Sequence, residues 1–86
     1  MHRETKKEVA RRLKSVEGHV RGVAKMVDQK DVTYREVVQQ TTAIFSAIRS
    51  INMVLLRDFM EERAGREGVS EETVDEMIKA VERVTK

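Results

Sequence analysis

The amino-acid sequence predicts an all-α protein of three helices, two long and one short. The 86 residues include no proline and only four glycines, so the strongest helix breakers are scarce. Apolar residues recur at intervals of three and four positions, the spacing of one helix face, and do not alternate as in a strand. A chain of this length forms one domain, residues 1–86, and usually needs a partner to bury enough apolar surface.

The first helix is expected over residues 5–29. Thr5 followed by Glu8 fits a capping box at its start. Its apolar residues are spaced alternately by four and three positions and form a narrow seam, which comprises Val9, Leu13, Val16, Val20, Val23 and Val27. A narrow seam of this kind suits packing against other long helices.

The second helix is expected to run from a capping box at Thr33 and Glu36 to about Ala64. Its apolar arc is wider and comprises Val37, Val38, Thr41, Ile44, Phe45, Ile48, Ile51, Val54, Leu55, Leu56, Phe59 and Met60. One partner helix cannot cover an arc this wide, so we expect a second copy of the chain to cover the rest. Asn52 interrupts the arc, either as a buried polar residue that sets register or as a solvent-facing one.

The third helix is short and follows a break at Gly65 and Gly68. Ser70 is its expected N-cap, and acidic residues in its first turn favour a helix start there. Its apolar face comprises Val74, Ile78 and Val81, with Met77 and Val84 beside them.

The composition excludes several classes of protein. The chain has no cysteine, which removes disulfides, thiolate metal sites and cysteine catalysis. It has no apolar run long enough for a membrane span, and its charged N-terminus does not resemble a signal peptide, so we expect a cytoplasmic protein. We identify no carboxylate pair, histidine-centred dyad or glycine-rich phosphate loop, and we therefore do not expect an enzyme.

Charge is distributed unevenly along the chain. Residues 1–30 hold nine lysines and arginines and four acids, whereas residues 61–86 hold five and eight. The net charge of +2 therefore conceals a basic N-terminal third and an acidic C-terminal third.

The basic residues of the first helix share one face. On a helical wheel, six of them fall in a strip about 80° wide, roughly opposite the apolar seam. These six are Arg3, Lys7, Arg11, Lys14, Arg21 and Lys25. The acids Glu4, Glu8 and Glu17 lie at the margins of the strip, whereas a merely solvated face usually mixes both signs. The strip therefore favours a polyanionic partner over simple solvation.

Two glycines, Gly18 and Gly22, lie beside the strip. They would let a phosphate backbone approach closely, or alternatively let another helix pack closely. The chain holds only three aromatic residues, so it lacks a stacking platform for single strands. The apolar seam has no tryptophan or phenylalanine to enter lipid, which argues against a membrane partner. Double-stranded DNA is the expected partner.

Two segments resemble a known family. Residues 12–23 (RLKSVEGHVRGV) and residues 40–44 (QTTAI) are similar to the copper-sensing and nickel/cobalt-sensing repressors, CsoR/RcnR. The resemblance covers nearly the whole chain. It implies an antiparallel four-helix-bundle dimer that assembles to a homotetramer. It also implies repression by binding operator DNA, which is released when an inducer occupies a site between protomers.

The resemblance places four cations on the DNA-binding face: Arg12, Lys14, Arg21 and, more loosely, Arg49. Arg12 lies outside the strip on the helical wheel, so packing or a local ion pair is an alternative role for it.

The sequence departs from the family at the metal-sensing positions. Aligned on the second segment, the three ligand positions hold Tyr34, Phe59 and Arg63, none of which is a soft metal ligand. A metal cofactor is therefore implied only by the resemblance. We hypothesise that Tyr34 and Phe59 pack against each other across the dimer interface in place of the metal.

Other metal ligands are weak candidates. His2 and His19 are the only histidines, and a lone histidine on a surface helix is more often solvated. Asp58, Glu61 and Glu62 could hold a hard cation, although acids at a helix end are usually solvated.

The sequence thus predicts a DNA-binding repressor with an altered or absent metal response. The alternative is a helical scaffold or protein-interaction module without specific DNA binding, and a metal carrier is a more distant third.

Overall fold

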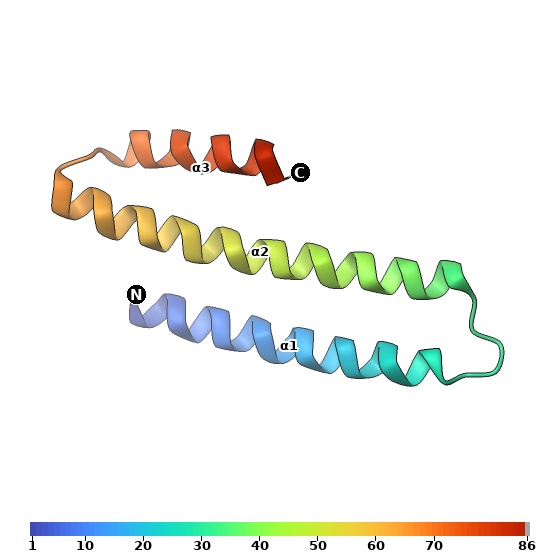
Figure 1. Cartoon of the computed structure of the whole chain (residues 1–86). Helices are drawn as coiled ribbons and strands as arrows, with labels where there is room; N and C mark the ends of the chain where they lie inside the picture. The colour runs from blue at the N-terminus through green and yellow to red at the C-terminus, as the bar shows by residue number, and fades with distance from the viewer. Residues whose placement is uncertain (86) are drawn as a thin grey trace.

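The computed structural model describes residues 1–85, and the side chains of residues 1–83. The side chain of Val84, assigned above to the apolar face of the third helix, lies outside this range. Three helices follow one another: α1 spans Arg3–Val27, α2 spans Tyr34–Glu67 and α3 spans Glu71–Thr85 (Figure 1). The described residues form no strand, and the predicted all-α class with two long helices and one short is confirmed.

The start of α1 differs from the prediction. The helix begins at Arg3 with His2 as the N-cap, and no side chain caps it, so the capping box at Thr5 and Glu8 is wrong. The Glu8 carboxylate instead accepts hydrogen bonds from Arg11 and Arg12. Thr5 is already the third residue of the helix, so it does not occupy the N-cap position that a capping box requires.

The start of α2 is as predicted. The backbone N–H of Glu36 donates to Thr33 Oγ1 at 3.1 Å, and the backbone N–H of Thr33 donates to the Glu36 carboxylate at 3.3 Å. These reciprocal bonds form the capping box and fix where the loop after α1 turns into α2.

The end of α2 lies three residues beyond Ala64. Gly65 is an ordinary helical residue, so its predicted role as a helix breaker is wrong. Gly68 ends the helix with φ 75°, a left-handed conformation that favours glycine. The backbone N–H of Thr73 then donates to Ser70 Oγ at 3.2 Å, which confirms Ser70 as the cap of α3.

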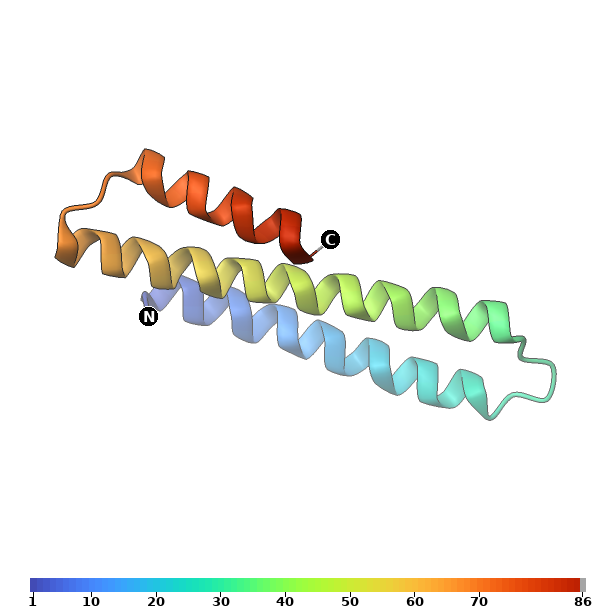
Figure 2. The same ribbon diagram turned by 45° about the horizontal axis from the view of Figure 1, so that its top comes forward.

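The three helices lie side by side in a single layer. α1 and α2 form a long antiparallel hairpin, and α3 folds back along the C-terminal half of α2 (Figures 1 and 2). The Cα atoms span 58 × 27 × 11 Å, so the protomer is little more than one helix thick. A layer this thin can enclose only a small core.

The buried core is correspondingly small. Val9 and Val23 of α1 and Ile51 of α2 are buried in the hairpin, while Val74 and Ile78 of α3 are buried against the end of α2. The rest of the predicted seam of α1 is divided: Val16 is half-buried, and Leu13, Val20 and Val27 remain exposed. The α1 seam is therefore only half covered by α2.

None of the helices within residues 1–85 is long and apolar enough to cross a membrane.

Candidate nucleic-acid interface

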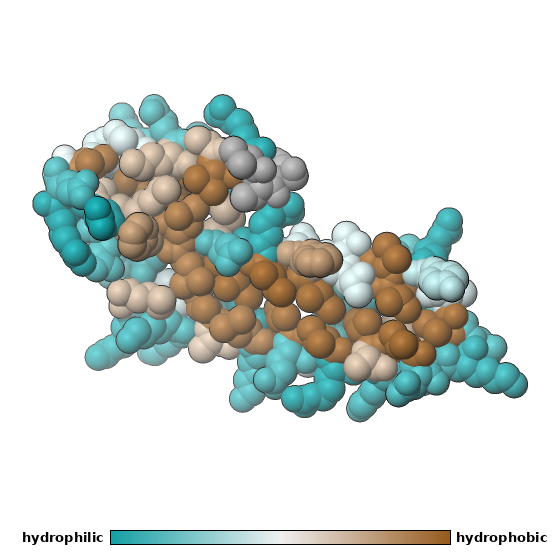
Figure 3. Space-filling view, in the orientation of Figure 1, coloured by the Kyte–Doolittle hydropathy of each residue, from teal (hydrophilic) through white to brown (hydrophobic). Residues whose placement is uncertain are grey.

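The six cations of the strip on α1 are all exposed. They are Arg3, Lys7, Arg11, Lys14, Arg21 and Lys25, and we call this set the α1 cationic face. Val9 and Val23 are buried against α2 on the other side of the helix, which turns the cations outward. Hydrophilic side chains accordingly project from the edge of the molecule that α1 forms (Figure 3).

Two of these cations carry acidic partners. Arg11 Nη2 lies 2.7 Å from Glu8 Oε1, and Arg21 Nη2 lies 3.1 Å from Glu17 Oε1. The expectation that acids stay off the strip is therefore wrong here, because side chains three or four positions apart on a helix can reach each other. Both arginine side chains remain 69% exposed, and exposed ion pairs contribute little to stability. A phosphate can therefore compete with these carboxylates.

The other four cations present unpaired charge. Within residues 1–85, Arg3, Lys7, Lys14 and Lys25 form no ion pair. They are distributed along α1 from its first turn to its last, and together with Arg11 and Arg21 they form a row of positive side chains on its outer face.

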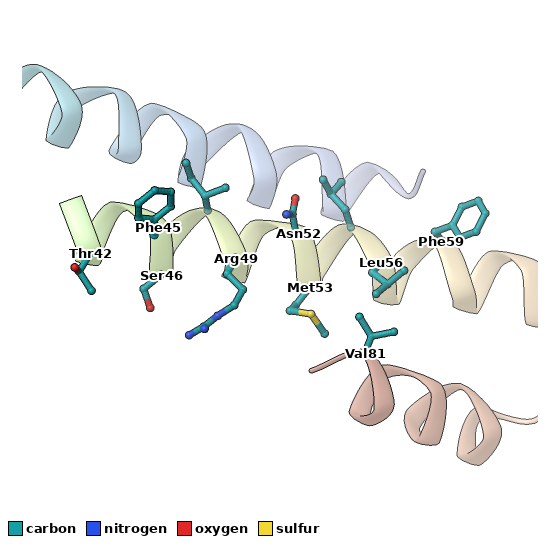
Figure 4. A pocket seen from close by; sticks show the side chains of 11 residues that line it. Thr42, Phe45, Ser46, Arg49, Asn52, Met53, Leu56, Phe59 and Val81 are labelled. Carbon is teal, nitrogen blue, oxygen red and sulfur yellow. The ribbon is translucent and has the colours of Figure 1, made fainter. Parts of the chain in front are cut away.

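Arg12 and Arg49 lie apart from the α1 cationic face. Arg12 is half-buried, and its Nε donates to Glu8 Oε1 at 2.7 Å, so it makes the local ion pair considered above. The two hydrogen bonds from Arg11 and Arg12, in that order of strength, hold the pKa of Glu8 below its usual range. Arg49 points away from α1 and lies beside Met53 (Figure 4). Within one protomer, Arg49 therefore does not lie next to the cations of α1.

The two glycines beside the strip face open space. A Cβ added at Gly18 or Gly22 would meet no atom within 4 Å. No other helix of the protomer therefore packs against them among the described residues.

The three positions that align with the metal ligands of the family, Tyr34, Phe59 and Arg63, lie toward the two ends of α2. Tyr34 is the first residue of the helix and is 94% exposed, while Phe59 is 58% exposed near the other end. The Arg63 guanidinium lies over the Phe59 ring, 5.8 Å from its centroid. Twenty-five positions of helix separate Tyr34 from Phe59 by about 37 Å, so the two rings can meet only between protomers.

These positions do not fit a metal ion. A phenol, a phenyl ring and a guanidinium offer no ligand for copper(I), nickel or cobalt. The part of the chain that the structure describes holds no cluster of three or more histidines and acids able to bind a metal.

The two histidines make hydrogen bonds instead. His19 is half-buried between α1 and α2, and its Nε2 lies 2.7 Å from Gln40 Oε1. The His2 ring pairs with the carboxylate of Asp58, and the backbone N–H of His2 donates to Asp58 Oδ2 at 3.1 Å. Sequence reasoning missed this link because 56 positions separate the two residues.

Asp58 is buried, with only 6% of its surface exposed. The hydrogen bond from His2 lowers the pKa of Asp58 and raises the pKa of His2. The neighbouring acids are also engaged: Glu61 lies 3.8 Å from Arg57, and Glu62 accepts from Arg66 at 2.5 Å. These carboxylates hold cationic side chains where the sequence suggested a site for a hard cation.

The chain is similar in sequence to known transcriptional repressors. A stretch of 51 residues is 41% identical to the copper-sensing transcriptional repressor RicR of Mycobacterium tuberculosis. The matched stretch covers 59% of this chain and 52% of that protein, so the chain spans about half the length of this curated relative. No solved structure matches the chain. Residues 5–83 match the family described as metal-sensitive transcriptional repressor, which confirms the resemblance of the two sequence segments. The chain belongs to the metal-sensitive transcriptional repressor family.

Proposed function

We propose that this protein is a repressor that binds operator DNA through the α1 cationic face. The observation that carries the proposal is the row of six outward cations on one rigid helix. The row extends over about 33 Å, at 1.5 Å per residue. Duplex DNA carries a phosphate charge about every 1.7 Å along its axis, so a straight row of cations can contact several phosphates at once.

The mode of contact follows from the residue types. Lysine and arginine side chains on an exposed helix bind phosphates and release condensed counterions, which positions the protein on the duplex. Sequence selectivity then comes from base contacts or from DNA shape. Arg49 lies on the far side of α2 and joins this surface only through a neighbouring protomer.

The proposed active form is a homo-oligomer, a dimer or a tetramer. The protomer exposes 6996 Å², whereas a compact monomer of 9.9 kDa exposes about 5,200 Å². Stable protein interfaces cover about 800 Å² on each partner, so the excess of about 1,800 Å² matches about two such contacts. We place this oligomer in the cytoplasm, with residues 1–86 acting as one domain.

The metal response is altered or absent in this proposal. The relative is a copper-sensing repressor, but the ligand positions of this chain hold Tyr34, Phe59 and Arg63. Release from the operator would therefore depend on an inducer other than a metal bound at those positions.

A mobility-shift titration tests the proposal. The duplex from upstream of the protein's own gene is compared with a scrambled duplex of the same length at two salt concentrations. A repressor should prefer its own duplex by at least about 10³-fold.

The alternative function is a helical scaffold without specific DNA binding, and the long exposed apolar face of α2 is the observation that favours it. A scaffold would bind both duplexes equally, weakly and with strong salt dependence. That result would overturn the repressor proposal.

A further inference from the structure

The short helix α3 is held against α2 by a small apolar core. The buried centre of this core comprises Ala64, Val74 and Ile78, and the residues packed around it are Met53, Met60 and Val69. Arg57 Nη1 also donates to Asp75 Oδ1 at 2.6 Å, but an ion pair this exposed contributes little to stability. The attachment of α3 therefore depends on apolar contacts, and two methionine thioethers supply part of them.

Two cavities that are open to solvent lie beside this core. Met60 and Met77 line a cavity of about 310 Å³ between α2 and α3, and Met77 is 41% exposed. Met53 lines a larger cavity of about 850 Å³, and it leaves α2 on the side where Val81 of α3 lies (Figure 4). Met53 and Met60 are only half-buried, so a small polar molecule in solution can reach both sulfur atoms.

Methionines supply all the sulfur of the chain. The sequence has five methionines and no cysteine, so an oxidant finds thioethers and no thiol. Three of the five, Met53, Met60 and Met77, gather where α3 meets α2. The other two lie elsewhere: Met1 precedes α1, and Met26 is in its last turn. The sulfur of the chain is therefore concentrated at the attachment of α3.

We propose that Met53 and Met60 form an oxidation site that controls whether α3 stays attached to α2. The oxidant is a peroxide, which transfers one oxygen atom to the thioether sulfur. The O–O bond of hydrogen peroxide breaks, an S–O bond forms and water is released, so the sulfur loses two electrons and the peroxide gains them. The product is a methionine sulfoxide, which a methionine sulfoxide reductase converts back to the thioether.

The polarity of the sulfoxide explains why α3 would detach. The side chains that form the centre of the core are apolar, and a polar group buried among them without a hydrogen bond costs free energy. The connection leaves α3 free to move away, because only residues 68–70 join it to α2. A detached helix of 15 residues is marginal in water, so the amides of α3 lose their protection from exchange. This switch does not depend on the proposed DNA binding.

Hydrogen exchange followed by mass spectrometry tests the proposal on the full chain. The protein is treated with millimolar hydrogen peroxide, and its sulfoxides are located by peptide mapping. Oxidation should accelerate amide exchange in α3 by at least about tenfold, whereas the amides between Val9 and Val23 of α1 should keep their protection. Treatment with methionine sulfoxide reductase should restore the protection of α3.

Three results would overturn the proposal. The first is unchanged exchange in α3 when both Met53 and Met60 carry a sulfoxide. The second is an equal loss of protection in α1 and α3, which would mean that oxidation unfolds the whole chain. The third is oxidation of Met1 under conditions that leave Met53 and Met60 unmodified, which would mean that the oxidant does not reach the core.

Leucine substitution separates the core thioethers from the others. Met53→Leu/Met60→Leu removes both oxidisable sulfur atoms from the core and nearly conserves volume, so α3 should stay protected after peroxide treatment. Met26→Leu/Met77→Leu is the matched control, which removes two thioethers from outside the core and should respond to peroxide like the native protein. Release of α3 in the first variant, or its retention in the second, would contradict the assigned site.

Glutamine at position 60 tests polarity without an oxidant. Met60→Gln places a polar amide at the edge of the core, and it should accelerate exchange in α3 before any peroxide is added. Protection of α1 in the same sample should equal that of the native protein. Native protection of α3 in this variant would show that a polar group at position 60 does not release the helix.

Discussion

Acidic side chains set how much positive charge α1 presents to a partner. Glu17 neutralises Arg21, and Glu8 is shared between Arg11 and Arg12. The sequence showed the row of cations correctly, but its helical wheel treated side chains as fixed points. Long flexible side chains reach their neighbours three and four positions away, which a wheel does not represent.

Removal of Glu17 should therefore strengthen DNA binding. In Glu17→Gln the Arg21 guanidinium loses its partner, and we expect affinity for the duplex to rise about two- to threefold, given ion-pair energies of about 0.5 kcal/mol. Glu71→Gln removes the same charge from α3 and should leave affinity unchanged. Fluorescence anisotropy with labelled duplex measures both variants. Equal affinities would show that Arg21 does not contact DNA.

The buried Asp58 makes stability depend on pH. The raised pKa of His2 means that its contribution is complete below about 6.5 and is lost as the pH rises through the raised value. The lowered pKa of Asp58 means that its contribution is present above about 3.8 and is lost as the pH falls through the lowered value. The ion pair is therefore strongest in the window between these limits.

Asp58→Asn keeps the shape of the side chain and removes its charge. The thermal midpoint of the native protein should fall between pH 5.5 and pH 8, and the variant should show a smaller fall. His2→Gln is the matched control and should flatten the same pH dependence. Thermal melts followed by circular dichroism measure the effect, and an unchanged pH dependence in Asp58→Asn would rule out this ion pair.

At the scale of helices, the start of α2 and the start of α3 were predictable from local chemistry. The Thr33–Glu36 box and the Ser70 cap depend on neighbours within three residues, which a sequence shows directly. The start of α1 was not predictable in the same way. The helix begins before Thr5, and the Glu8 carboxylate accepts hydrogen bonds from Arg11 and Arg12 instead of from a backbone N–H.

The two glycines near the end of α2 should respond oppositely to alanine. Gly68→Ala places a Cβ on a left-handed residue and should destabilise the protein by about 1–2 kcal/mol. Gly65→Ala lies inside the helix and should stabilise it by up to about 1 kcal/mol. An added Cβ meets no atom within 4 Å at either position, so packing does not interfere. Urea unfolding measures both, and equal effects would contradict the assigned end of α2.

At the scale of the whole molecule, the sequence predicted the need for a partner from the wide apolar arc of α2. The structure is consistent with that prediction, since three helices in one layer leave part of the arc exposed, namely Val38, Phe45, Ile48 and Phe59. The sequence could not show which positions α1 and α3 cover, because that depends on how the helices cross. It also could not show the link between His2 and Asp58, which joins the N-terminus to the C-terminal half of α2.

The salt dependence of DNA binding tests most directly whether the α1 cationic face binds the duplex. Lys7→Ala/Lys14→Ala/Lys25→Ala removes three unpaired cations from that face, whereas Arg66→Ala/Lys79→Ala/Arg83→Ala removes three from the acidic end of the chain. In the first variant the slope of log affinity against log salt concentration should decrease in magnitude by about three, at roughly 0.9 per lost phosphate contact. The second variant should retain the native slope. Equal slopes in the two variants would contradict the account.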